Sequence, residues 1–109
     1  GNHAMVRPGE LNLMTAGRGM SHSEVSTAAT SVLHGAQLWL ALPAGERFAD
    51  PGFEHYAPPA VPGEGFELRV FLGSLGGSRS PVRTYSPVLG AELLLGAGAT
   101  VRLALDRSF

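Results

Sequence analysis

The sequence predicts a mainly β fold made of short antiparallel strands. Fifteen glycines and eight prolines among 109 residues favour many short elements over long helices. Every second residue of 66–72 is apolar, which is the period of a strand with one buried face. Residues 91–95 and 101–105 are two more apolar runs, and the glycine-containing turn 96–98 separates them. This arrangement predicts a hairpin near the C-terminal end.

Earlier segments fit the same class. Residues 11–14 are strand-like, and residues 37–42 predict a strand that Pro43 ends. Residues 73–78 are expected to form a loop, and they lack the Gly-Lys-Ser/Thr ending of a phosphate-binding loop. Four of the eight prolines fall within residues 50–65. That segment is therefore interpreted as a Pro-rich linker with stiff, extended pieces that packs onto something through its aromatic residues.

A His-x-Glu pair is the most informative chemical feature of the chain. His22 and Glu24 follow a glycine-rich turn, which in turn follows the strand-like run 11–14. If the stretch is extended, side chains two positions apart leave the same face, so an imidazole and a carboxylate would point into one cavity. Two His and one carboxylate are a common ligand set of non-haem Fe(II) oxygenases. The pair alone is weak evidence, because chance supplies many such spacings.

The same residues also permit a helix. Ser21 and Glu24 match a capping box, and apolar residues recur after them at helical spacing as far as Leu33. In a helix, successive residues are about 100° apart, so His22 and Glu24 would diverge and Glu24 would be a cap. Several β-branched residues in 25–32 disfavour that conformation. The residues by themselves leave both interpretations open.

Three segments resemble the pirin family, whose members are two-domain cupins. They are residues 8–24 (PGELNLMTAGRGMSHSE), 33–43 (LHGAQLWLALP) and 80–84 (SPVRT), in family order and spacing. The resemblance implies a partial cupin barrel of jelly-roll type. Because pirins are more than twice this length, it also implies an internal fragment. The expected division is the second half of an N-terminal cupin in residues 1–49, the linker in 50–65 and the start of a C-terminal cupin in 66–109.

The resemblance also implies a ligand set. Pirins hold one metal with three His and one Glu, and His22 and Glu24 match the second pair of these ligands. The first pair is a His-x-His motif, which this sequence lacks. Fe(II) is thus expected in the intact protein, whereas the fragment is not expected to hold a metal stably unless another chain, His3 or His34 completes the site. Glu24 is expected to be both a ligand and the catalytic base that accepts a substrate proton.

Other residues near the motif have weaker assignments. By resemblance, Gln37 and Trp39 lie close to the metal cavity, although Trp39 also suits an ordinary core position. His34 is expected to be structural, with its imidazole bonded to a backbone carbonyl. His55 is expected to be a surface or packing residue. Arg18 is expected to be solvated or paired with a carboxylate, between glycines that free the turn.

Three functions follow from these assignments. The first is a metal-dependent, Fe(II)-type dioxygenase of the quercetin or flavonol class in the intact parent protein, with a small aromatic substrate. The second is a metal- or redox-sensing regulator that binds a transcription factor or an enzyme. The third is an inactive structural fragment that self-associates through unpaired strand edges. The sequence leaves the natural substrate, the metal and the oligomeric state open.

Composition excludes several other classes. The net charge is −1 and all eight basic residues are Arg without a basic stripe, which argues against direct nucleic-acid binding. The apolar runs are far shorter than the roughly 20 residues of a membrane span. Without cysteine there is neither a disulfide framework nor thiolate chemistry. No signal peptide is visible in the sequence, so a cytoplasmic location is the default expectation.

Overall fold

The computed structural model describes residues 2–108 and shows a mainly antiparallel β architecture, as expected. Its one helical element in those residues is the short 3-10 helix η1 (Ala44–Glu46). No helix among them is long and apolar enough to cross a membrane. The strands are β1 (Leu11–Thr15), β2 (Gly52–Tyr56), β3 (Val61–Gly63), β4 (Phe66–Leu72), β5 (Ser74–Leu75), β6 (Ser78–Arg79) and β7 (Gly90–Leu95).

The main sheet has the strand order β3-β4-β7, and every neighbouring pair is antiparallel. Alternate residues of β4 are buried, as its period-2 pattern predicted. Leu68 and Val70 form the core together with Leu75 of β5. These residues are the most apolar part of the alternating face, and removing them from water supplies the main driving force for this half of the chain.

Two further features shape β4 and hold the segment after β6 against it. A register shift between Val70 and Leu72 leaves Phe71 as an extra residue in β4, a β-bulge that bends the strand. Ser80 is buried behind the β5–β6 hairpin, where its hydroxyl donates to the carbonyl of Phe71 at 2.8 Å and accepts from the amide of Val82 at 3.1 Å. Ser80 therefore anchors residues 80–84 to the bulged strand.

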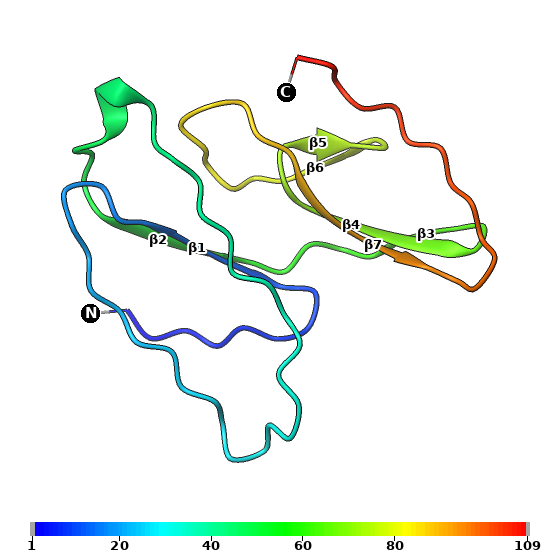
Figure 1. Cartoon of the computed structure of the whole chain (residues 1–109), viewed down its shortest axis with the longest axis horizontal. Helices are drawn as coiled ribbons and strands as arrows, with labels where there is room; N and C mark the ends of the chain where they lie inside the picture. The colour runs from blue at the N-terminus through cyan, green and yellow to red at the C-terminus, as the bar shows by residue number, and fades with distance from the viewer. Residues whose placement is uncertain (1, 109) are drawn as a thin grey trace.

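The second sheet is the β1–β2 pair, in which Leu11 lies opposite Tyr56 and Thr15 opposite Gly52. Figure 1 shows this pair beside the main sheet, with residues 57–60 joining the two. The backbone amide of Arg83 donates to Glu54 of β2 at 3.4 Å, which links the two groups of strands. The segment 50–65 is therefore extended and packed, and it supplies β2 to the β1–β2 pair and β3 to the main sheet.

Two strand predictions were wrong. Residues 37–42 and 101–105 have no regular secondary structure, so the C-terminal hairpin is absent from the described residues, where β7 pairs only with β4. The segment after β7 turns back across the core face, where Leu103 packs against the core. Both segments have strand-like sequences, but a strand requires a hydrogen-bonded neighbour. Neither segment finds one in residues 2–108.

Candidate metal centre

β1 and a glycine turn carry the chain to the His-x-Glu pair. Gly17 and Gly19 have φ values of +52° and +133°, a region that favours glycine, as the sequence indicated. A Cβ on Gly17 would lie 2.0 Å from the carbonyl oxygen of Ala49. Arg18 donates its backbone amide to the same oxygen at 3.1 Å and pairs its guanidinium with Asp50. The expectation that Arg18 pairs with a carboxylate is confirmed.

Beyond the turn, the backbone leaves the sheet. Residues 21–33 contain no helix and no strand, so the helical alternative for these residues is wrong. Ser21 and Glu24 therefore do not form a capping box. A helix here would need an apolar surface against which to pack its stripe, and the structure presents none to these residues, which are all exposed from 21 to 33.

His22 and Glu24 point toward each other on this irregular segment. The Nε2 atom of His22 lies 3.9 Å from Oε1 of Glu24. The side-chain amide of Gln37 donates to the same carboxylate oxygen at 3.1 Å. The structure thus brings together three residues that the sequence had assigned to one cavity, and Gln37 contacts the proposed ligand rather than only lying near it.

The two donor atoms are compatible with one metal ion. Imidazole nitrogen and carboxylate oxygen bind first-row metals at about 2.0–2.2 Å. Two such donors on one ion lie about 3 Å apart at a right angle and about 4 Å apart when opposed. The observed separation of 3.9 Å falls in this range. Within residues 2–108, however, no group of three or more His, Cys, Asp or Glu side chains converges around a possible metal position.

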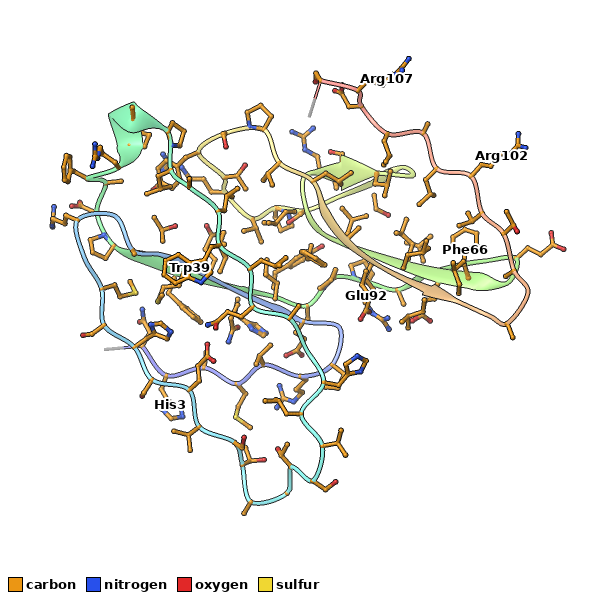
Figure 2. The ribbon with its side chains drawn as sticks, viewed as in Figure 1. His3, Trp39, Phe66, Glu92, Arg102 and Arg107 are labelled. Carbon is orange, nitrogen blue, oxygen red and sulfur yellow. The ribbon has the colours of Figure 1, made fainter. Side chains whose placement is uncertain are left out.

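The remaining assigned residues are dispersed. Trp39 is 97% exposed, and in Figure 2 it projects from its segment separately from His3 on the N-terminal segment. His34 is also exposed, and no hydrogen bond to it is found in the described part of the chain. These positions show that the cavity expected around the metal is not enclosed by this chain.

The structure reveals one polar network that the sequence interpretation missed. Nδ1 of His55 lies 2.7 Å from Oδ1 of Asn12, its cross-strand partner between β1 and β2. Nε2 of His55 lies 3.7 Å from Oε2 of Glu10, and that oxygen accepts from the amide of Arg7 at 2.8 Å. His55 and Asn12 come together because they are opposite each other in the β1–β2 register. The sequence could have indicated this contact only if part of residues 50–65 had been predicted as a strand rather than as a linker. His55 is therefore part of the scaffold that supports β1.

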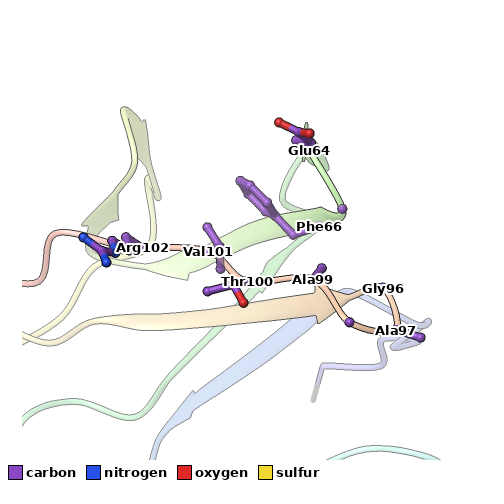
Figure 3. A pocket seen from close by; sticks show the side chains of 10 residues that line it. Glu64, Phe66, Gly96, Ala97, Ala99, Thr100, Val101 and Arg102 are labelled. Carbon is purple, nitrogen blue, oxygen red and sulfur yellow. The ribbon is translucent and has the colours of Figure 1, made fainter.

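An open groove lies elsewhere, at the far end of the main sheet. It runs between Phe66 and the segment that follows β7, with Glu64 at one side and Arg102 at the other (Figure 3). Neither His22 nor Glu24 contributes to its lining. The groove is thus distinct from the candidate metal centre.

Comparisons with known proteins agree with this architecture. A crystal structure of quercetin 2,3-dioxygenase from Acinetobacter baumannii matches with a TM-score of 0.81 at 43% identity, over 87% of this chain and 32% of that chain. The antiparallel sheets and this match define a partial cupin barrel of jelly-roll type.

The family follows from the sequence matches. The model of the family Pirin matches residues 1–40. A Pseudomonas aeruginosa protein named for quercetin 2,3-dioxygenase is 42% identical over 110 residues, which cover all of this chain and 35% of that protein. Human pirin is 32% identical over 102 residues, covering 91% of this chain and 35% of that protein. The chain belongs to the pirin family, and it spans about a third of the length of these relatives.

Proposed function

We propose that this chain supplies one half of the metal centre of a pirin-type, metal-dependent dioxygenase that acts on quercetin or a related flavonol. The observation that carries the proposal is the 3.9 Å approach of His22 and Glu24, with Gln37 bonded to the carboxylate. A relative and a structural neighbour, each more than 40% identical, are named for this activity. The activity is proposed for the intact protein, because the chain covers about a third of those relatives.

Each residue has a distinct role in this proposal. His22 and Glu24 would hold the metal, with Fe(II) as the proposed ion, and two His from outside this sequence would complete the site. When bound, the metal would supply the electron transfer between a chelated catechol-like substrate and O2. The second oxygen of Glu24 would accept the proton of a substrate hydroxyl, since a carboxylate beside the bound hydroxyl is placed for general-base catalysis.

Gln37 is a positioning residue in this scheme. Its amide donates to Oε1 of Glu24 at 3.1 Å and so fixes the direction of the carboxylate. Hydrogen bonds to a metal ligand of this kind typically contribute about 10–100-fold to metal affinity or activity. Trp39 is proposed to line the substrate cavity once the rest of the barrel covers it. Its full exposure in this chain leaves the indole free to take that position.

The same proposal includes a division of the chain. Residues 1–49 would complete an N-terminal cupin, residues 50–65 would connect it, and residues 66–109 would begin a C-terminal cupin. The support is that the His-x-Glu pair follows β1 of the β1–β2 pair, whereas the core residues of β4 belong to the main sheet. Limited proteolysis of the intact protein should cut within residues 57–60 before it cuts within either sheet. Earlier cleavage inside β4 would contradict this division.

A cytoplasmic location is also proposed, on the absence of cysteine from the chain. Fractionation of cells that express the intact protein is the check, and recovery in the periplasmic or secreted fraction would contradict the proposal.

A graft tests the function directly. The segment of the Acinetobacter baumannii enzyme that matches this chain is replaced by this chain, which restores a full-length protein with the missing ligands. We expect near-stoichiometric metal by elemental analysis and cleavage of quercetin. His22→Ala and Glu24→Ala should abolish both, and Gln37→Ala should lower metal affinity by about 10–100-fold.

The matched control for the graft is His55→Ala, which removes an imidazole that lies on the β1–β2 sheet and contacts Asn12. It should leave the metal content unchanged. A graft that folds and binds no metal would overturn the assignment of His22 and Glu24. A graft that binds metal through these residues but does not cleave quercetin would favour the metal-sensing regulatory function instead. The inactive-fragment alternative predicts that the graft fails in both respects.

A further inference from the structure

The turn after β1 is tied to the segment that precedes β2. The backbone amide of Arg18 donates to the carbonyl of Ala49 at 3.1 Å. Arg18 is three residues after Thr15 and Ala49 is three residues before Gly52, so the hydrogen bond joins the two residues that the β1–β2 register would bring together next. The turn therefore continues the pairing of β1 and β2 past the regular sheet, and in Figure 1 it lies beside the chain that joins η1 to β2.

The side chain of Arg18 adds a second tie one residue further along. Its guanidinium pairs with the carboxylate of Asp50, the residue after Ala49. A single hydrogen bond leaves two segments free to rotate about it, whereas a second contact at a neighbouring residue restrains their relative direction. A rigid, planar guanidinium holds a carboxylate more directionally than a flexible ammonium group does. Arg18 thus fixes the direction of the turn as well as its position.

The segment on the other side of this contact is itself fixed. The amide of Ala49 donates to the carbonyl of Glu46 in η1 at 2.9 Å, and the amide of Glu46 donates to the carbonyl of Pro43 at 2.8 Å. The turn is therefore held against a short helix and the hydrogen-bonded residues that follow it.

The His-x-Glu pair comes soon after this anchor. His22 is four residues after Arg18, and residues 21–37 are exposed and contain no helix and no strand. Among the described residues, the hydrogen bonds found for 21–37 join members of that segment to one another, including Gln37 to Glu24. The place of the pair relative to the β1–β2 sheet therefore depends on the last fixed point before it, which is Arg18.

We propose that the ion pair of Arg18 and Asp50 positions the metal centre. By restraining the direction in which the chain leaves β1, it presents the imidazole of His22 and the carboxylate of Glu24 together to the metal. The two members of the ion pair are positioning residues, since they act on the chain that leads to the ligands. This inference rests on the proposed function and adds two residues to its site.

The exposure of the ion pair determines what should change when it is lost. The side chains of Arg18 and Asp50 are 64% and 80% exposed, and an exposed ion pair adds little to the global free energy of unfolding. The main effect is therefore expected in the affinity for metal, because that affinity depends on how often the ligands are correctly placed.

Cobalt binding tests the proposal in the graft in which this chain replaces the matching segment of the Acinetobacter baumannii enzyme. Asp50→Asn removes the charge of the carboxylate and keeps its shape. It should lower the affinity for Co²⁺ by about three- to fivefold, the factor that loss of an exposed ion pair can produce. The matched control is Glu92→Gln, the same change in the ion pair that Glu92 makes with Arg69 in the main sheet. It should leave the affinity for Co²⁺ unchanged.

Exchanging the two charges separates the ion pair from any other role of its members. Arg18→Asp brings two carboxylates together and Asp50→Arg brings two guanidinium groups together, so each should weaken Co²⁺ binding by about fivefold or more. The double variant restores an ion pair, and its affinity should return to within about twofold of that of the unchanged graft. The unfolding temperature of the metal-free graft should change by no more than about 2 °C in all of these variants.

Amide hydrogen exchange examines the same contact without metal. The Arg18 amide is bonded to the carbonyl of Ala49. In the metal-free graft, Asp50→Asn should speed the exchange of this amide by about three- to fivefold, because opening of the turn becomes more frequent. Glu92→Gln should not change the exchange rate of this amide.

Three results would overturn the inference and leave the proposed function intact. They are equal Co²⁺ affinity with and without Asp50→Asn, a double variant that binds as weakly as the single charge reversals, and unchanged exchange of the Arg18 amide in Asp50→Asn. A folded graft that retains Arg18 and Asp50 but binds no Co²⁺ would overturn the proposed function, and this inference with it.

Discussion

The main sheet and the segment from residue 21 to residue 41 are made of similarly apolar sequence, yet they end in opposite environments. Leu68 in β4 is 2% exposed, whereas Trp39 in the segment is 97% exposed. β4 has a hydrogen-bonded strand on each side, and the segment has no strand on either side within the described residues. The difference shows that apolar sequence produces a strand only where neighbouring strands supply both hydrogen bonds and a surface to cover.

The comparison predicts its largest effect at the core. Leu68→Ala should lower the free energy of unfolding by about 2–5 kcal/mol, since it leaves a cavity beside Val70 and Leu75. Leu38→Ala, the same change in the exposed segment, should alter the free energy of unfolding by no more than about 0.5 kcal/mol. Urea denaturation measures both. Equal effects would mean that the segment is as well packed as the sheet.

A smaller effect is expected at the turn that joins β1 to the segment. Gly17→Ala forces a side chain into a positive φ and against the carbonyl of Ala49, so it should cost at least about 1–3 kcal/mol. Gly45→Ala is the control, because a Cβ added at that position would meet no atom within 4 Å and its φ is not positive. Similar thermal stability for the two variants would show that the turn does not constrain the fold.

The next smaller loss of stability is expected in the β1–β2 pair, whose burial is intermediate between that of the main-sheet core and that of residues 21–41. Asn12→Ala removes the acceptor 2.7 Å from Nδ1 of His55 and should cost about 0.5–1.5 kcal/mol. His55→Ala should cost a similar amount, and the double variant should cost little more than either alone because both changes remove the same bond. Additive losses in the double-mutant cycle would show that the two side chains do not interact.

The smallest effect is a local pH response at the C-terminal end. The backbone amide of Ser108, and then its hydroxyl, donate to Asp106 and lower the pKa of that carboxyl below its usual 3.8. A lowered pKa in the folded state means that the stabilisation is present above the usual value and is lost as the pH falls through the folded value. The Ser108 amide resonance should therefore titrate with a midpoint below pH 3.8, and Asp106→Asn should remove that titration.

Sequence patterns were sufficient where local and tertiary preferences agree. The alternation in residues 66–72 predicted β4, and residues 11–14 lie within β1, because both runs find antiparallel partners. The i, i+2 spacing is compatible with the 3.9 Å approach of His22 and Glu24 on an irregular segment. The family resemblance adds a prediction that spacing cannot make, namely that the pair belongs to a larger ligand set.

The same patterns were insufficient where a partner had to be chosen. Residues 101–105 have the composition of a strand, but they are not paired with β7, and Leu103 packs against the core instead. Residues 50–65 have the prolines of a linker, yet they supply β2 and β3. In each case the sequence specifies an extended backbone, and the choice of neighbour depends on contacts between residues far apart in the chain.

The sequence by itself determined the β class and the glycines of the turn, because these depend on periodicity and on backbone sterics. The tertiary structure alone decided which strands pair, that Gln37 bonds to Glu24 and that His55 joins the β1–β2 sheet. These features depend on register and burial, which arise only when distant segments are brought together.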